Sequence, residues 1–282
     1  MATSTLHLVD PQLLPLLETI PPFEIAEAAL PLMRSRPARF EVGAAAIART
    51  DKTERRVPGP SAAPEVGVVI YRPKGATGPL PCIFHVHGGG YITGSALGNE
   101  AMHRPLAADL GCVIISVEYR LAPETKFPGA VEDGYAALTW LVATAAELGV
   151  DTARIGVMGE SAGGGLAAGL ALLVRDRGEF RFAFQHLIYP MIDDRTCVRQ
   201  DPHPHVGEFV WTENSNRFGW KCLLGVEPGG EGISPYAAVP VELHVYPGAF
   251  HGFQWAPGAD VSKQAARDSR NALARAMRDQ HY

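Results

Sequence analysis

The sequence predicts an α/β protein whose mostly parallel sheet is covered by helices on both faces. Short, nearly continuous apolar runs are typical of buried strands. They lie at residues 65–71, 82–86, 113–117, 155–158 and 184–189. Helix-length patterns separate several of these runs, at residues 102–110, 130–148 and 161–177. Sheets built in this way bind ligands at the carboxyl ends of their strands.

Both ends of the chain and one internal stretch depart from this alternation. Residues 1–36 have a helical pattern that a proline pair breaks in the middle. Residues 193–235 are aromatic, polar and loop-rich, and we interpret them as an insertion over the strand ends. The sheet is expected to resume at residues 241–246, and residues 259–278 to form a closing amphipathic helix.

The composition excludes several function classes. Hydrophobic residues make up 46% of the 282 residues and charged residues 20%, as in ordinary globular proteins. The net charge of −5 argues against nucleic-acid binding. No apolar run is long enough to span a membrane, and the N-terminus does not resemble a signal peptide. The four cysteines are widely spaced without a CxxC motif, which favours a reducing cytoplasm.

Residues 159–163 read Gly-Glu-Ser-Ala-Gly and match the pattern Gly-x-Ser-x-Gly. A strand candidate leads in and a helix candidate leads out, as in the sharp turn that exposes a nucleophilic serine. The glycines permit a strained backbone at Ser161 and leave room for the helix. We therefore predict that the Ser161 hydroxyl projects at the carboxyl end of its strand.

Residues 87–90, His-Gly-Gly-Gly, follow the strand candidate at 82–86. Glycines leave backbone N–H groups accessible, so we expect the amides of Gly89, Gly90 and Ala162 to form an oxyanion hole. A phosphate-binding loop is the rival interpretation. It is disfavoured because no helix follows directly and neither phosphate-loop pattern is met.

His251 is the candidate general base. It lies in the turn after the last strand candidate and follows Ser161 in the chain, as this type of hydrolase requires. Its Nε2 would take the serine proton and later deliver it to the leaving group.

The remaining histidines are expected to be structural. His85 and His186 lie in apolar strand candidates and are predicted to belong to the core. His203 and His205 lie near Asp201, but a third clear metal ligand is missing. We expect neither a metal nor another cofactor.

Together these motifs resemble the hormone-sensitive-lipase-like family of bacterial carboxylesterases in the α/β-hydrolase superfamily. The similar stretches lie at residues 87–94, 118–138, 151–168, 211–225, 233–238 and 239–253. The resemblance implies an eight-stranded core under a helical cap. It also implies cofactor-free hydrolysis of short- to medium-chain carboxylic esters, a small-molecule ester as partner, and a homodimer.

The resemblance implies roles for single residues and a division of the chain. It makes Ser161 the nucleophile, His251 the base and Glu160 a structural hydrogen-bonding residue; the oxyanion donors would be Gly89, Gly90 and Ala162. The division is a cap segment at 1–45, the core at 46–192, a second cap segment at 193–232, and the last strand and helix at 233–282. Four aromatic residues of the second cap segment are expected to line an apolar pocket or to pack the cap onto the core. They are Phe209, Trp211, Phe218 and Trp220.

The sequence departs from the family where members carry a further strand, the acid of the catalytic triad and a helix. Here Ala238 runs straight into Val239, so we expect a sheet one strand short and an impaired enzyme. A triad hydrolase without its acid typically loses about 10⁴ in kcat. Asp194 or Asp193, after the strand candidate at 184–189, is the candidate surrogate acid.

Two alternatives stay open. The chain could be a non-catalytic α/β-hydrolase that binds a ligand in the same pocket. It could also be a shortened version of an active esterase, because the junction after Ala238 falls between family segments.

Overall fold

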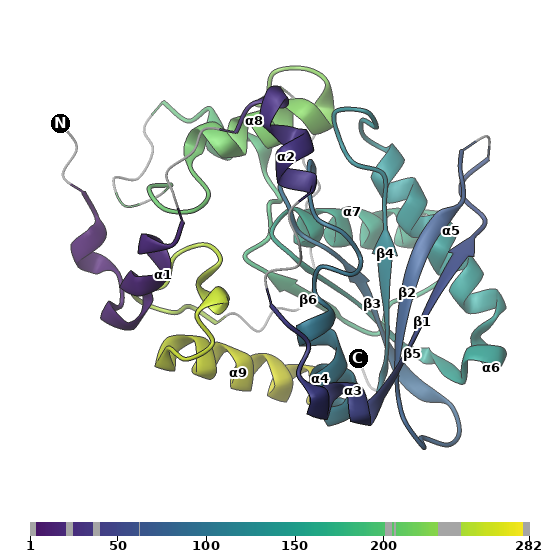
Figure 1. The fold of residues 1–282 in the computed structure, drawn as a ribbon. Coiled ribbons are helices and arrows are strands. Elements are labelled where there is room, and N and C mark those ends of the chain that lie inside the picture. Colours follow the sequence, from purple (N-terminus) through teal and green to yellow (C-terminus); the bar gives the residue numbers. More distant parts are fainter. Residues whose placement is uncertain are drawn as a thin grey trace.

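A computed structural model gives the arrangement of the chain (Figure 1). It describes residues 4–20, 25–35, 40–61, 63–200, 205, 207–230 and 244–278.

A six-stranded sheet lies at the centre of the described ranges, in the order β1-β2-β4-β3-β5-β6. The strands are β1 (Thr50–Val57), β2 (Val66–Pro73), β3 (Leu80–Val86), β4 (Val113–Glu118), β5 (Val150–Glu160) and β6 (Gln185–Ile188). The last four strands are parallel to one another, whereas β1 and β2 are antiparallel to their neighbours. The predicted α/β class with a mostly parallel sheet is confirmed. β1 was not predicted, because most of its side chains are exposed and it has no apolar run.

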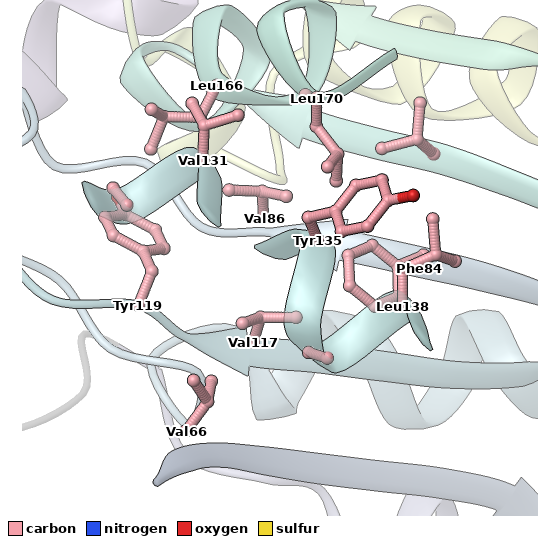
Figure 2. Close-up of a cluster of buried hydrophobic side chains, with 14 of the residues drawn as sticks. Val66, Phe84, Val86, Val117, Tyr119, Val131, Tyr135, Leu138, Leu166 and Leu170 are labelled. Carbon is pink, nitrogen blue, oxygen red and sulfur yellow. The ribbon is translucent and has the colours of Figure 1, made fainter. Parts of the chain in front are cut away.

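Helices cover both faces of the sheet (Figure 1). One face carries α5 (Gly129–Ala143) and α7 (Ala162–Arg177), which pack against each other. Figure 2 shows this cluster, in which Val86 of β3 and Val117 of β4 lie beneath Leu166 of α7. The opposite face carries α4 (Glu100–Leu110) and α9 (Asp260–Ala276), and α9 reaches the core through Leu273. Dry packing on both faces explains the nearly continuous apolar runs of the strands.

Further helices lie outside these two layers, and in Figure 1 α2 and α8 lie near each other at one end of the sheet. The α-helices are α1 (Leu14–Glu18), α2 (Leu30–Arg34), α3 (Ala44–Arg49), α6 (Ala145–Leu148) and α8 (Glu213–Leu224). The 3₁₀-helices are η1 (Leu6–Leu8), η2 (Pro11–Leu13), η3 (Glu27–Ala29), η4 (Asp194–Cys197) and η5 (Phe253–Trp255). The N-terminal part is therefore helical, as predicted, but in short turns rather than in two longer helices.

The strand predicted at residues 241–246 is not formed over its described part. His244, Val245 and Tyr246 are coil, and residues 241–243 and the junction after Ala238 lie outside the described residues. The Tyr246 hydroxyl donates to Asp268 Oδ2 on α9 at 3.0 Å. This stretch therefore packs toward the helix, and β6 pairs with β5 alone among the strands of the described ranges.

All four cysteines are buried and form no disulfide, as their spacing predicts. Among the helices of the described ranges, none is long and apolar enough to span a membrane.

Candidate active site

Ser161 lies in the turn between β5 and α7, with φ 55° and ψ −122°. A residue other than glycine rarely adopts such a backbone, and surrounding contacts must hold it there. The Ser161 N–H donates to the Ile188 carbonyl and its own carbonyl accepts from Met191 N–H, both at 2.9 Å. A Cβ on Gly159 would overlap the Gly163 carbonyl, so only glycine fits before the serine. The predicted strand–turn–helix geometry is present.

The ring of His251 reaches this serine from the turn before η5. His251 Nε2 lies 2.9 Å from Ser161 Oγ, although 90 residues separate them. The centroid of the imidazole lies 4.5 Å from that of Tyr189 and 6.3 Å from that of Trp211. Burial lowers the pKa of His251 to about 4. The imidazole is therefore neutral near pH 7 and its Nε2 can accept the serine proton.

The turn that carries His251 is held by the two ends of the chain. Asp10 N–H donates to the Gly248 carbonyl at 2.9 Å. Phe253, two residues after His251, is buried in a cluster with Leu13 and the start of α9. No local motif indicates the contacts of this turn with Asp10 and Leu13, because they join residues more than 200 positions apart.

The glycine loop after β3 lies beside Ser161. Gly89 and Gly90 line the same cavity as the serine and have φ 125° and 63°. Their N–H groups donate to no other group in the described part of the chain. Ala162 begins α7, so its N–H is one of the unpaired donors at a helix N-terminus. These three amides are available to an anionic oxygen bound at Ser161.

Neither candidate surrogate acid contacts the base. Asp194 is buried and its Oδ2 accepts from Gly229 N–H at 2.6 Å, while Asp193 pairs with Arg195 at 2.8 Å. Among the described residues, no carboxylate forms a hydrogen bond or ion pair with His251. The expected pairing of Asp193 or Asp194 with His251 depended on a strand beside β6, and residues 244–246 do not form it.

Comparison with known proteins identifies the family of the fold. Residues 83–237, more than half of the chain, match the family described as alpha/beta hydrolase fold. The chain belongs to this family.

Several similar proteins are named as esterases. The chain is 35% identical over 182 residues to a carboxylesterase, NlhH, of Mycobacterium tuberculosis, covering 64% of this chain and 57% of that protein. It is 45% identical over 112 residues to an arylesterase of Saccharolobus solfataricus, covering 40% and 36%. The chain thus spans about half the length, or less, of these curated relatives. The structure of a bacterial heroin esterase superposes with a TM-score of 0.84 at 32% identity, covering 98% of this chain and 100% of that one.

Glu160, the last residue of β5, connects this strand to the glycine loop. Its Oε1 accepts from Gly88 N–H at 2.8 Å and from Asn99 Nδ2 at 2.7 Å, and its Oε2 accepts from His85 Nε2 at 2.9 Å. Burial would raise the pKa of Glu160, but His85 and the other donors lower it to about 2. The carboxylate is therefore ionised, and it contacts the loop rather than His251. Asn99 belongs to no motif, so sequence analysis did not single it out.

A large cavity, of 2540 Å³, includes Ser161 in its wall. Of the four aromatic residues considered for a pocket or for packing, Trp211 lines the cavity and lies against Gly90. Trp220 is buried against Tyr91, with ring centroids 5.0 Å apart, and so packs α8 onto the core. His85 is a core residue as predicted, whereas His186 is only partly buried.

Of the three residues considered as a metal site, His205 lies within the described residues. Asp201 and His203 lie outside the described residues. Within the described ranges, no group of three or more His, Cys, Asp or Glu side chains is placed to hold a metal ion.

Proposed function

We propose that the chain is a serine carboxylesterase that hydrolyses short- to medium-chain carboxylic esters through an acyl-enzyme. The observation that carries this proposal is the 2.9 Å contact between Ser161 Oγ and His251 Nε2 in a strained turn at a helix N-terminus. The names of the similar proteins, a carboxylesterase and an arylesterase, support the same substrate class.

The chemistry follows from the positions of these groups. His251 takes the Ser161 proton as the serine oxygen attacks the ester carbonyl. The amides of Gly89, Gly90 and Ala162 stabilise the charge on the carbonyl oxygen of the tetrahedral intermediate. His251 then protonates the departing alcohol, and water attacks the acyl-enzyme by the same steps in reverse. No cofactor enters this sequence.

We propose that His251 works without a carboxylate partner and that the esterase is correspondingly slow. The described surroundings of His251 support this, because burial lowers its pKa and no carboxylate of the described ranges forms a hydrogen bond or ion pair with it. A triad acid orients the imidazole and stabilises the imidazolium, and its loss costs about 10⁴ in kcat. Tyr189 and Trp211 lie against the ring and limit its movement instead.

Two segments are proposed to cap the core of residues 46–192. In the first, at residues 1–45, Arg34 Nε donates to the Ile92 carbonyl, which follows the glycine loop, at 2.8 Å. The second, at residues 193–232, contacts the first because Glu208 accepts from Thr5 N–H at 2.6 Å. The first segment therefore contacts the loop beside the site, and the second segment contacts the first.

Turnover of p-nitrophenyl butyrate tests the proposal. Wild-type protein should hydrolyse it, Ser161→Ala should lower the turnover about 10²-fold, and a fluorophosphonate should label the wild type at Ser161 alone. Folded protein that shows neither Ser161-dependent turnover nor labelling would rule the esterase out.

A ligand-binding protein of the same fold is the second candidate. The lack of a carboxylate at His251 within the described residues favours it. Calorimetric binding of a small ester with no turnover at all would support this candidate over the esterase.

A further inference from the structure

The loop that carries the proposed oxyanion donors is anchored at its first residues. Tyr119 hydroxyl donates to the His87 carbonyl at 2.8 Å, and the His87 ring stacks on Tyr119 with centroids 4.1 Å apart. His87 Nδ1 lies 2.8 Å from the Gly88 carbonyl. The remaining group of this peptide, Gly88 N–H, is the one that donates to Glu160. The orientation of Gly88 therefore sets the direction in which Gly89 and Gly90 continue.

Glu160 differs from the other anchors in two respects. It precedes Ser161 directly, so one residue links the position of the nucleophile to that of the glycine loop. It is also an ionised carboxylate, 22% exposed, and hydrogen bonds to charged acceptors are about twice as strong as neutral ones. Asn99 and His85 hold this carboxylate from two further elements.

Close packing makes the link sensitive to small changes. A Cβ on Gly88 would lie 2.8 Å from the Glu160 backbone carbonyl, so the loop passes directly over the end of β5. Ser116 Oγ lies 2.9 Å from His85 Nδ1, which fixes the ring whose Nε2 donates to Glu160. A shift of the carboxylate therefore moves the loop, because the surrounding groups leave it little other freedom.

We propose that Glu160 is a positioning residue for the oxyanion hole, holding Gly88 so that the Gly89 and Gly90 amides point toward the oxygen bound at Ser161. This inference rests on the proposed esterase function. It assigns Glu160 no contact with substrate and no proton transfer.

Glu160→Gln is the variant that tests this role, because it keeps the shape of the side chain and removes its charge. The amide nitrogen would also face His85 Nε2, which now donates to the carboxylate. Oxyanion contacts strengthen in the transition state, so kcat on p-nitrophenyl butyrate should fall about 10- to 100-fold. This loss is smaller than the roughly 10²- to 10³-fold fall in kcat that follows complete removal of one oxyanion donor. KM should stay within about twofold, as expected for an interaction made only in the transition state. The inhibition constant of an alkylboronic acid, whose tetrahedral adduct occupies the hole, should rise in parallel with the loss of kcat.

Glu118→Gln is the matched control. Glu118 also accepts a backbone N–H of the same loop, from Ala96 at 2.6 Å, but it does not contact the glycines. Glu118→Gln should keep the wild-type kcat and boronate inhibition. Its melting temperature should fall less than that of Glu160→Gln, because Glu160 accepts hydrogen bonds from three groups. Should Glu160→Gln fail to fold, Asn99→Ala serves in its place. It removes one donor to Glu160, and kcat should fall about 3- to 10-fold with KM unchanged.

Three outcomes would overturn the inference. They are a wild-type kcat in folded Glu160→Gln, equal losses in the Glu160 and Glu118 variants, and a rise in KM with kcat unchanged. If Ser161→Ala matches wild-type turnover, or if wild type shows no turnover and no boronate inhibition, the esterase proposal fails as well. The two failures are therefore distinguishable.

Discussion

Two serine–histidine pairs in this molecule look alike at the level of the hydrogen bond. Ser161 Oγ lies 2.9 Å from His251 Nε2, and Ser269 Oγ lies 2.9 Å from His186 Nε2. Burial lowers the pKa of both histidines to about 4. A search for a serine beside a neutral imidazole would therefore find both pairs.

The backbone around the two serines differs. Ser269 lies well inside α9, where the helix hydrogen bonds satisfy the nearby amides. Ser161 is held at positive φ at the very start of α7, beside the glycine loop. The difference teaches that unpaired amides at the serine, more than the histidine contact, distinguish a reaction site from a structural hydrogen bond.

Removing each serine should give the largest difference between the two pairs. With a complete triad, losing the serine costs about 2 × 10⁶ in kcat and losing the acid alone about 3 × 10⁴. If no acid acts on His251, Ser161→Ala should therefore cost only about 10²-fold, the ratio of these two losses. Ser269→Ala should leave turnover of p-nitrophenyl butyrate unchanged. A loss near 10⁶ for Ser161→Ala would show that an acid does act.

The dependence of kcat/KM on pH should show whether the pKa of His251 is near 4 or near 6.5, and the expected difference is smaller than that between the serine variants. With its pKa near 4, His251 stays neutral at pH 5, whereas a pKa of 6.5 would leave about 3% of it neutral. kcat/KM at pH 5 should therefore be about 30-fold higher than an ordinary histidine would allow. An acid limb near pH 6.5 instead would indicate a carboxylate beside the ring. His186→Asn should leave this limb in place.

The same histidines set the sign of the pH dependence of folding. Their pKa is lower in the folded protein than in the unfolded chain, so the unfolded chain binds protons first as the pH falls. The free energy of unfolding should therefore be highest above about pH 6.5 and decrease toward pH 4. Denaturant unfolding of the wild type at several pH values measures this. A smaller decrease in His186→Asn would assign part of the effect to the second pair.

Trp211 should influence the choice of ester by a factor of a few. Its ring lines the cavity over Gly90, so Trp211→Ala enlarges the space beside the serine. The ratio of octanoate to butyrate hydrolysis should rise about 3- to 10-fold, within the range that pocket contacts supply. Phe209→Ala, at a residue absent from the cavity wall, should leave the ratio unchanged. Equal ratios in both variants would place the acyl chain elsewhere.

Ser269→Ala should have the smallest effect, and on stability rather than on activity. Loss of one hydrogen bond to a partly buried imidazole costs about 0.5–1.5 kcal/mol. Chemical denaturation measures this difference directly. A variant that unfolds as the wild type does would mean that the His186 contact is replaced by water.

Much of the fold and of the site follows from local sequence. The strand runs and helix patterns were correct for the core, because apolar periodicity reports which side of an element is buried. The turn at Ser161 was predictable since only glycine fits beside it. β1 was not predictable, because an exposed edge strand has no apolar pattern. The coil at residues 244–246 was not predictable either, because an apolar pattern does not show which strand, if any, the segment pairs with.

The sequence by itself determined the parallel α/β core through strand and helix patterns between residues 65 and 189. It also determined the strained serine and the glycine loop, each within about ten consecutive residues. The order of the chain also predicted His251 as the partner of Ser161, which lies 90 residues before it. Tertiary structure alone decided that Glu160 holds Gly88. It also decided that the turn with His251 is supported by Asp10 and Leu13. The physical reason is that such contacts depend on how distant segments pack, and neither propensity nor spacing along the chain records that packing.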